Sequence, residues 1–188
     1  MDAKPALRKH FLALRDALDP RVHAEASASI GRHLESLCRT RRFRRVAAFW
    51  PLGSEVDLRP LVAERTDWLW YFPRVASTAP PRLVWGGEPL EPGLWGLMEP
   101  VFSQHFMPPV DLLLGPGLAF DEDGHRIGYA RGFYDALLDR LGERLPILGV
   151  AFACQRTALL PRDPQDLPVQ GLVTERGLSW FGQQEDES

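Results

Sequence analysis

Residues 124–138, GHRIGYARGFYDALL, combine the residue types that bind phosphate. Glycines let backbone N–H groups approach a ligand closely, and the guanidinium groups of Arg126 and Arg131 have a fork geometry that suits a phosphate. If Arg131 or Gly132 opens the helix that follows, the first N–H groups of that helix point at the same ligand. The stretch therefore predicts an anion-binding loop. A glycine turn that merely opens a helix is the alternative interpretation.

Asp135 lies in the same stretch, where a carboxylate would repel a phosphate. A divalent cation between the two groups removes this conflict, because Mg²⁺ is usually held by one or two carboxylates together with phosphate oxygens. The alternative is an acidic residue in the first helical turn, where it interacts favourably with the helix dipole. The stretch matches neither the P-loop nor the dinucleotide-binding glycine pattern, so no standard motif decides between the two.

Four further charged residues could serve the same site. Lys4 and Arg8 are one turn apart on a predicted helix and can act together on one ligand. Glu55 lies in a loop after a predicted strand, and Asp166 lies in the segment PQDLPV. Taken alone, each of these residues is more typical of a solvated surface.

The composition excludes several classes of protein. The 188 residues are 45% hydrophobic and 25% charged, an ordinary globular balance with room for a sizeable core. The net charge of -3 gives no general attraction to nucleic acid or anionic membrane. Cys38 and Cys154 form neither a disulfide framework nor a zinc motif. The polar start and the lack of an apolar run of about 20 residues favour a cytoplasmic protein.

Apolar spacing predicts two helices at the start of the chain. Leu7, Phe11, Leu14 and Leu18 form one helical stripe. Asp19 and Pro20 suit the N-cap and the first position of the next helix. That helix is expected to turn five residues inward: Val22, Ala26, Ile30, Leu34 and Leu37. The basic run 39–45 is interpreted as its solvated end, and RNA binding is the less favoured alternative.

Short apolar runs without alternation predict strands that are buried on both faces. These runs are 45–50, 68–73, 82–87, 110–117, 146–152 and 171–175, with helices expected over 57–65 and 136–145 and an irregular connection over 88–109. The order predicts a single α/β domain over 1–188 with a mainly parallel sheet and a frayed acidic tail at 181–188. Ligands of such sheets bind where strands end, so the loops after Trp50, Phe72, Leu114 and Phe152 are favoured.

Six segments give the chain a resemblance to a known family. They are KPALR, FWPLGSEVD, FPRV, GLMEP, LLGPGLAFDEDGHRIGYARGFYD and DLPVQGLVTE. In this order and spacing they resemble the 5-formyltetrahydrofolate cyclo-ligase (methenyltetrahydrofolate synthetase) family, from about Lys4 to Gly177. The resemblance implies a three-layer α/β/α sandwich of the NagB/RpiA/CoA-transferase type. It also implies Mg²⁺-dependent cyclisation of 5-formyltetrahydrofolate to 5,10-methenyltetrahydrofolate, driven by ATP through an N5-iminium phosphate.

The same resemblance implies roles for individual residues. It assigns ATP binding to Lys4, Arg8, Arg126, Ile127, Gly128, Tyr129, Ala130, Arg131, Gly132, Phe133 and Tyr134. It assigns substrate binding to Trp50, Glu55, Trp95, Tyr129, Arg131 and Phe133. Arg131 is the implied catalytic residue, Asp135 and Asp166 are the implied Mg²⁺ ligands, and Arg74 could meet an anionic substrate group. Ala130 stands where the family commonly has glycine, which would strain the loop only at a positive φ.

Two alternatives remain open at this stage. A non-catalytic relative could bind nucleotide or folate in the same pocket, and binding without turnover would identify it. A sugar-phosphate isomerase of similar fold could use Glu55 as its base. It would leave the Lys4–Arg8 pair and the two aspartates without a purpose. A monomer without nucleic-acid or membrane partners is expected.

Overall fold

The computed structural model describes residues 3–104, 108–129, 132–134, 137, 145–164 and 166–182. Its helices are α1 (Lys4–Asp16), α2 (Pro20–Arg41) and α3 (Arg59–Glu64), with 3-10 turns η1 (Leu94–Gly96) and η2 (Ala153–Gln155). Its strands are β1 (Arg45–Ala47), β2 (Leu69–Thr78), β3 (Pro81–Gly86), β4 (Leu90–Pro92), β5 (Met98–Pro100), β6 (Leu112–Pro116), β7 (Ala119–Phe120), β8 (Arg126–Ile127), β9 (Ile147–Val150), β10 (Gly171–Thr174) and β11 (Gly177–Trp180).

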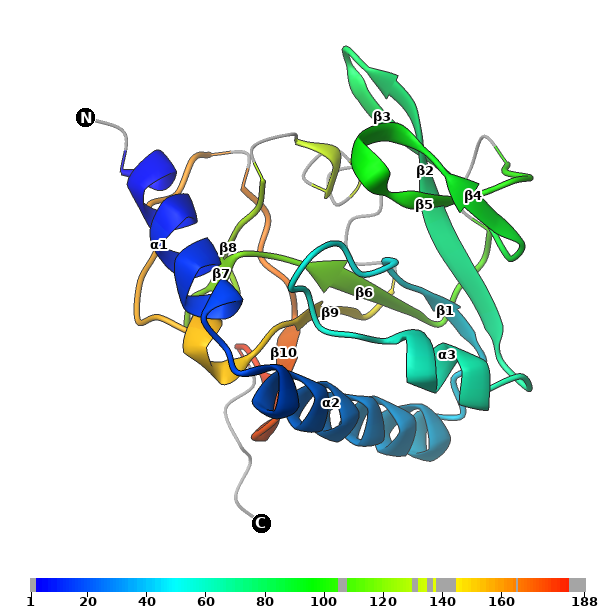
Figure 1. Cartoon of the computed structure of the whole chain (residues 1–188), viewed down its shortest axis with the longest axis horizontal. Helices are drawn as coiled ribbons and strands as arrows, with labels where there is room; N and C mark the ends of the chain where they lie inside the picture. Colours follow the sequence, from blue (N-terminus) through cyan, green and yellow to red (C-terminus); the bar gives the residue numbers. More distant parts are fainter. Residues whose placement is uncertain are drawn as a thin grey trace.

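The main sheet is built from seven of the described strands, in the order β11-β10-β9-β6-β1-β2-β3 (Figure 1). The five inner strands run parallel, and β3 and β11 pair antiparallel at the two edges. From β1 the chain continues outward to β2 on one side, and the later strands β6, β9 and β10 add on the other side. The strand order therefore reverses between β1 and β6, where α/β sheets bind their ligands. The expected α/β fold with a mainly parallel sheet is confirmed.

Helix α2 covers one face of the sheet with an apolar stripe. Ala26, Ile30 and Leu34 are buried in one cluster with residues of β1, β6, β9 and β10. The Asp19 carboxylate accepts the N–H groups of Arg21 and Val22, as expected of an N-cap. Val22 was expected to face inward but is 50% exposed, because the first turn of α2 extends past the sheet.

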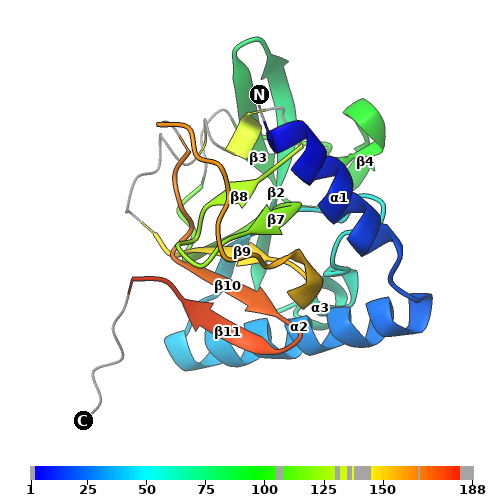
Figure 2. The ribbon, with the colours of Figure 1, turned by 90° about the vertical axis from the view of Figure 1, so that its left-hand side faces the viewer.

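The other face of the sheet is covered by a separate group of segments. Phe120 of β7 and the helical residue Leu137 are buried there against Leu113 and Leu172 of the sheet. Helix α1 packs on the β7–β8 hairpin, where Phe11 contacts a cluster that contains Leu118, Ala119, Ile127 and Leu160 (Figure 2). The sheet therefore lies between two layers, and α1 is attached to the second of them. Leu14 does not share this contact and is exposed, contrary to the predicted stripe.

Several predicted elements differ from the structure. Residues 88–109 were expected to be irregular, but they contain the antiparallel hairpin β4–β5 joined through η1. The short strands β7, β8 and β11 were not predicted. The helix expected over 136–145 falls largely outside the described residues, within which Phe133, Tyr134 and Leu137 are helical. No described helix has the length and apolarity needed to cross a membrane.

Candidate active site

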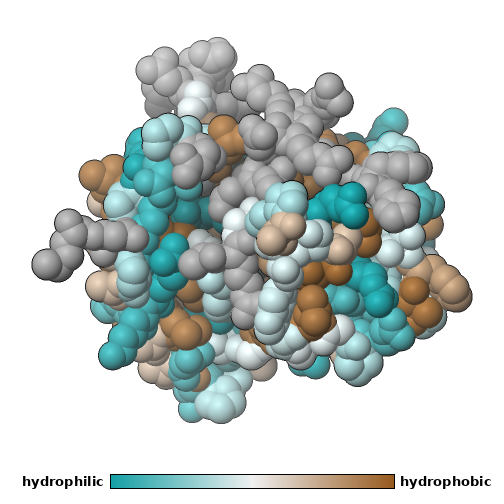
Figure 3. Space-filling model, turned by 90° about the horizontal axis from the view of Figure 1, so that it is seen from above, coloured by the Kyte–Doolittle hydropathy of each residue, from teal (hydrophilic) through white to brown (hydrophobic). Residues whose placement is uncertain are grey.

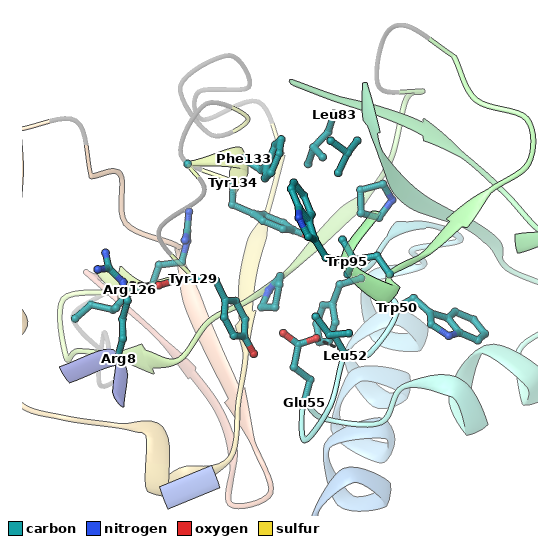
Figure 4. A pocket seen from close by; sticks show the side chains of 18 of the residues that line it. Arg8, Trp50, Leu52, Glu55, Leu83, Trp95, Arg126, Tyr129, Phe133 and Tyr134 are labelled. Carbon is teal, nitrogen blue, oxygen red and sulfur yellow. Dashed lines mark hydrogen bonds between the residues drawn. The ribbon is translucent and has the colours of Figure 1, made fainter. Parts of the chain in front are cut away.

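A cleft of about 210 Å³ opens at the switch point between β1 and β6 (Figure 4). Segments that follow all four predicted strand ends contribute to it, although β2 continues past Phe72 to Thr78. Leu52 and Glu55 follow β1, Pro73 and Val75 lie in β2, and Pro116 ends β6.

The long connection that follows Phe152 and leads to β10 reaches the cleft through Asp166. The residues directly after Phe152 do not line the cleft. Among them, Gln155 donates hydrogen bonds to the carbonyls of Gly117 and Leu118, at 2.8 and 3.0 Å.

Apart from Arg74, all of the predicted site residues that the structure describes line this one cleft. They are Lys4, Arg8, Trp50, Glu55, Trp95, Arg126, Ile127, Gly128, Tyr129, Gly132, Phe133, Tyr134 and Asp166. Three other predicted residues, Ala130, Arg131 and Asp135, lie outside the described residues. Their assignments to the phosphate loop, the catalytic step and the metal therefore stay predictions.

One end of the cleft is cationic. Lys4 and Arg8 belong to α1 and Arg126 belongs to β8. Figure 4 shows the side chains of Arg8 and Arg126 at this end. The Nε of Arg8 donates to the carbonyl of Gly128 at 3.0 Å, which ties α1 to the predicted phosphate loop. Arg126 is buried, with its guanidinium 5.8 Å from the centre of the Tyr134 ring. Positive groups from two distant parts of the chain thus meet at one point, as an anionic ligand requires.

The backbone of the predicted phosphate loop has little spare room. A Cβ on Gly128 would lie 3.3 Å from Nη1 of Arg126, so a larger residue there would press on that guanidinium. Gly132 has a φ of +67°, a left-handed conformation in which glycine is favoured. The structure therefore favours glycine at both positions, at Gly128 for lack of space and at Gly132 for its backbone conformation.

Asp166 lies beside Lys4 at this cationic end. The Nζ of Lys4 is 2.6 Å from Asp166 and 2.5 Å from Asp163, and the N–H of Asp163 donates to Asp166 at 2.8 Å. Burial acts to raise the pKa of Asp166, but its hydrogen bonds to Lys4 and Asp163 outweigh burial and lower it. Burial likewise acts to lower the pKa of Lys4, and the two aspartates reverse that effect. Both residues therefore stay charged at neutral pH.

Within the described ranges, no three His, Cys, Asp or Glu side chains come together as a complete metal site. Asp166 is the acidic group at the cationic end of the cleft, and it lies where phosphate oxygens would approach. One carboxylate beside a phosphate site fits Mg²⁺, which takes most of its ligands from phosphate and water. The described donor set is compatible with a metal bound mainly by a nucleotide.

The other end of the cleft is aromatic, with a single buried acid. Glu55 is 7% exposed, and the N–H of Leu52 donates to its Oε2 at 2.9 Å. Burial raises the pKa of Glu55 above its ordinary value, although the Leu52 N–H, the Arg15 charge and a Tyr129 hydrogen bond each act to lower it. Trp50 packs edge-on against Phe72, with ring centres 5.4 Å apart. This end suits a flat ligand that presents N–H donors.

Trp95 forms part of the rim of the cleft. It projects from η1, its ring centre lies 6.1 Å from that of Phe133, and it is 46% exposed. Its φ of +59° is unusual for a bulky residue and is held by the tight turn between β4 and β5. The hairpin β4–β5 therefore presents an aromatic ring to the opening.

Arg15 is a residue of the site region that the sequence did not single out. It is only 2% exposed, and its Nε donates to Ser54 Oγ at 2.9 Å. Its Nη2 donates to the hydroxyl of Tyr129 at 2.5 Å. One signal was available: Arg15 is four residues after Phe11, on the inward stripe of α1. An arginine at such a position calls for a polar partner in the interior.

Arg74, which was considered for an anionic substrate group, is engaged elsewhere. Its Nη1 lies 2.7 Å from Glu91 and 2.9 Å from the carbonyl of Pro100. Its Nε lies 3.9 Å from Glu99, a buried carboxylate that accepts the N–H of Val75. Arg74 is absent from the cleft lining and joins β2 to the β4–β5 hairpin. The described contacts of Arg74 therefore stabilise the packing of the hairpin on β2.

The fold and the cleft define an α/β protein with a ligand site at the switch point, cationic at one end and aromatic and acidic at the other. The model of the 5-formyltetrahydrofolate cyclo-ligase family matches residues 1–175, and the chain belongs to this family. The predicted family, and the prediction of a ligase of folate metabolism, are confirmed.

Individual relatives agree with this assignment. The 5-formyltetrahydrofolate cyclo-ligase of Haemophilus influenzae is 25% identical over 178 residues, which cover 87% of this chain and 92% of that protein. The structure of Aquifex aeolicus 5,10-methenyltetrahydrofolate synthetase is 33% identical, with a TM-score of 0.85 over 100% of this chain and 97% of that one. A synthetase from Mycoplasma pneumoniae, 23% identical, shares the fold with a TM-score of 0.76 over 93% of this chain and 99% of that one.

Proposed function

We propose that the protein cyclises 5-formyltetrahydrofolate to 5,10-methenyltetrahydrofolate, with Mg²⁺ and with conversion of ATP to ADP and phosphate. The observation that supports this most is the two-ended cleft. Lys4, Arg8 and Arg126 form a cationic end, and Glu55 lies at the aromatic end of the same cavity. Two different substrates, one rich in phosphate and one flat and rich in hydrogen-bond donors, would thereby meet head to head. The family assignment favours this ligase over a sugar-phosphate isomerase.

At the aromatic end, Glu55 would bind the pterin. A pterin presents paired N–H donors, and an ionised carboxylate accepts two hydrogen bonds side by side. Trp50, Trp95 and Phe133 would flank the flat rings and exclude water from them. Tyr129 lies between this end and the cationic end, so it would border both substrates (Figure 4).

At the cationic end, Lys4, Arg8 and Arg126 would hold the ATP phosphates. Asp166, together with Asp135, would hold Mg²⁺, which neutralises phosphate charge when bound. Arg131 would stabilise the phosphoryl group in transit, since a guanidinium fork matches its oxygens. These side chains orient the γ-phosphate toward the folate and lower the repulsion between the charged reactants.

The chemistry then needs position more than a reactive side chain. The formyl oxygen of the folate attacks the γ-phosphorus and ADP leaves, which gives an N5-iminium phosphate. N10 attacks the formyl carbon, the C–O bond breaks, phosphate departs with that oxygen, and N10 loses its proton. Holding the reacting atoms in contact is worth several orders of magnitude in rate, and phosphoryl transfer proceeds mainly by such positioning.

The test is the absorbance of the methenyl product over time. Purified protein receives 5-formyltetrahydrofolate, ATP and Mg²⁺, and each is omitted in turn. A signal that needs all three is the expected result. Folded protein that binds ATP and folate without forming product would instead be a non-catalytic relative.

We further propose that the enzyme works as a single-domain monomer in the cytoplasm, without nucleic-acid or membrane partners. Cys38 and Cys154 are free thiols, as is usual in a reducing compartment. Seen from above, the coloured surface has small apolar areas separated by hydrophilic ones (Figure 3). A stable dimer usually needs a larger continuous apolar area than the coloured part of this face offers. Light scattering coupled to size exclusion would test this, with a dimer mass counting against it.

A further inference from the structure

Arg15 is a buried cation at a point where three distant segments meet. It belongs to α1, and its guanidinium donates to Ser54 in the loop after β1 and to Tyr129 after β8. The guanidinium also lies 5.8 Å from the centre of the Tyr129 ring. A guanidinium with 2% exposure is costly to desolvate, so its contacts must offset that cost. Within the described residues, Arg15 forms no ion pair with a carboxylate, so its side-chain partners are the hydroxyls of Ser54 and Tyr129.

The Tyr129 hydroxyl passes the influence of Arg15 on to Glu55. That hydroxyl accepts the hydrogen bond from Arg15, and its interaction with the Glu55 carboxylate acts to lower the pKa of Glu55. Burial and the Glu55 charge raise the pKa of Tyr129, so the hydroxyl keeps its proton at neutral pH and can donate to the carboxylate. Figure 4 shows Tyr129 and Glu55 pointing toward one another inside the cleft. Arg15, Tyr129 and Glu55 thus form one polarised chain.

The main chain of Glu55 is fixed from the opposite side. His23 of α2 contacts the carbonyls of Ser54 and Glu55 through its Nε2, at 3.2 and 3.0 Å. Ser54 Oγ donates to Asp16, the neighbour of Arg15 on α1. The loop that presents Glu55 is therefore held by both α1 and α2. Of these two helices, α1 supplies the positive charge of Arg15 near the Glu55 carboxylate.

We propose that Arg15 is a positioning residue for folate recognition, which acts through Tyr129 to keep the Glu55 carboxylate charged and directed into the cleft. This inference rests on the proposed function. Arg15 itself does not line the cleft and is not expected to touch either substrate. Its role is specific to the folate end, because the cationic end is formed by other residues.

Charged and titratable groups from several described elements lie near Glu55. Arg15 comes from α1, Tyr129 follows β8, His23 of α2 meets the main chain, and Tyr134 is close enough for Glu55 to raise its pKa. Of these, Arg15 contributes a fixed positive charge. Loss of that charge should therefore make Glu55 harder to ionise.

The decisive experiment is the pH dependence of kcat/KM for 5-formyltetrahydrofolate in wild type and in Arg15→Met. We expect the acid limb of the variant's pH profile to move to higher pH by about one unit, since a nearby charge shifts the pKa of a buried carboxyl by about that much. At neutral pH, KM for the folate should rise about tenfold while KM for ATP changes little. Arg15→Lys should restore part of the shift. Arg21→Met, which removes an exposed arginine of α2, is the matched control.

A merely structural role gives a different result. Destabilised protein would lose kcat for both substrates, with the acid limb unmoved and with no advantage of Lys over Met; that outcome overturns the proposal. If Arg15→Met does not fold, Tyr129→Phe interrupts the same chain and must move the limb in the same direction. In the double variant the two shifts should not add, because one acts through the other.

Failure of the proposed function is recognised separately. Wild type without turnover would reject the reaction itself. Wild type with turnover, and an acid limb that Arg15→Met and Tyr129→Phe both leave in place, would reject only the role of Arg15.

Discussion

Lys4 and Asp166 are 162 residues apart in the chain, yet the Nζ of Lys4 lies 2.6 Å from the Asp166 carboxylate. The contact fastens α1 to the segment before β10 and closes the cationic end of the cleft. Asp163 accepts a second hydrogen bond from the same Nζ but is half exposed and does not line the cleft. The two aspartates therefore offer a matched pair for testing what the site requires.

Asp166→Asn should weaken the use of Mg²⁺ and ATP. The carboxylate is the described acid beside the phosphate site, so its loss should raise the Mg²⁺ concentration for half-maximal rate about tenfold or more. Asp163→Asn removes an equivalent partner of Lys4 and should change that concentration little. Metal titrations of both variants make the comparison. If both variants raised the Mg²⁺ concentration for half-maximal rate equally, Asp166 would act through its ion pair with Lys4 and not as a metal ligand.

Glu55→Gln should gain stability and lose function. The pKa of Glu55 is raised in the folded protein, so the folded state binds its proton more tightly than the unfolded state. In wild type the free energy of unfolding should then fall as pH rises from the ordinary value of 4.5 through the raised pKa. The glutamine variant lacks this loss and should be more stable above that window.

Urea unfolding at several pH values, with the methenyl assay beside it, measures both effects. We expect kcat/KM for the folate to fall at least about tenfold in Glu55→Gln, because an amide cannot accept both pterin N–H groups. Unchanged folate kinetics would remove Glu55 from the binding site. A stability difference that does not vary with pH would show that the gain has another origin.

Tyr134→Phe tests a buried hydroxyl that has no hydrogen-bond partner in the part of the chain that the structure describes. Its desolvation is uncompensated, so the variant should be more stable by about 1 kcal/mol, or a few degrees in Tm. If the hydroxyl serves a ligand, turnover should fall in the same variant. Thermal melts with and without substrates separate the two effects. A lower Tm for the ligand-free variant would contradict the structure.

Gly149→Ala and Gly31→Ala should have opposite effects on stability. A Cβ on Gly149 would lie 2.4 Å from the ring of Phe120, which fills the space between the layers, so the variant should lose about 1–3 kcal/mol. Gly31 lies inside α2, and its nearest contact would be an ordinary 3.9 Å from Leu61. Alanine there should gain up to about 1 kcal/mol through helix propensity. Denaturant titrations that gave both variants the same sign would contradict this packing.

Much of the fold could be predicted because the inner strands have strong local signals. Strands β6, β9 and β10 are continuous apolar runs, because strands inside a parallel sheet are buried on both faces. The Asp19–Pro20 start of α2 also follows from local chemistry. By contrast, β7 and β8 have two residues each, too few for a period of two to be seen. Their position depends on the packing of α1 on the hairpin and of Phe120 on the main sheet, and both contacts join segments that are distant in sequence.

The site shows the same division. The resemblance pointed to a set of residues whose described members, apart from Arg74, all line one cleft, because those segments could be compared with a known family. Arg15 escaped notice because an arginine on a helix is usually solvated, and its burial depends on Tyr129 and Ser54 arriving from other segments. The exposure of Val22 and Leu14 has a similar cause. Helical spacing defines a face, but the extent of the neighbouring layer decides which turns are covered.

The β4–β5 hairpin gives a last prediction, the protection of Trp95 by ligands. Trp95, Leu97 and Met98 line the cleft, so bound ATP and folate should press the hairpin into place. Chymotrypsin should cut after Trp95, which is 46% exposed, more slowly when both substrates are present. Leu159 is 67% exposed and lies outside the cleft, so cleavage there provides an internal control. Equal cleavage at Trp95 with and without substrates, against an unchanged rate at Leu159, would show that the hairpin does not close over them.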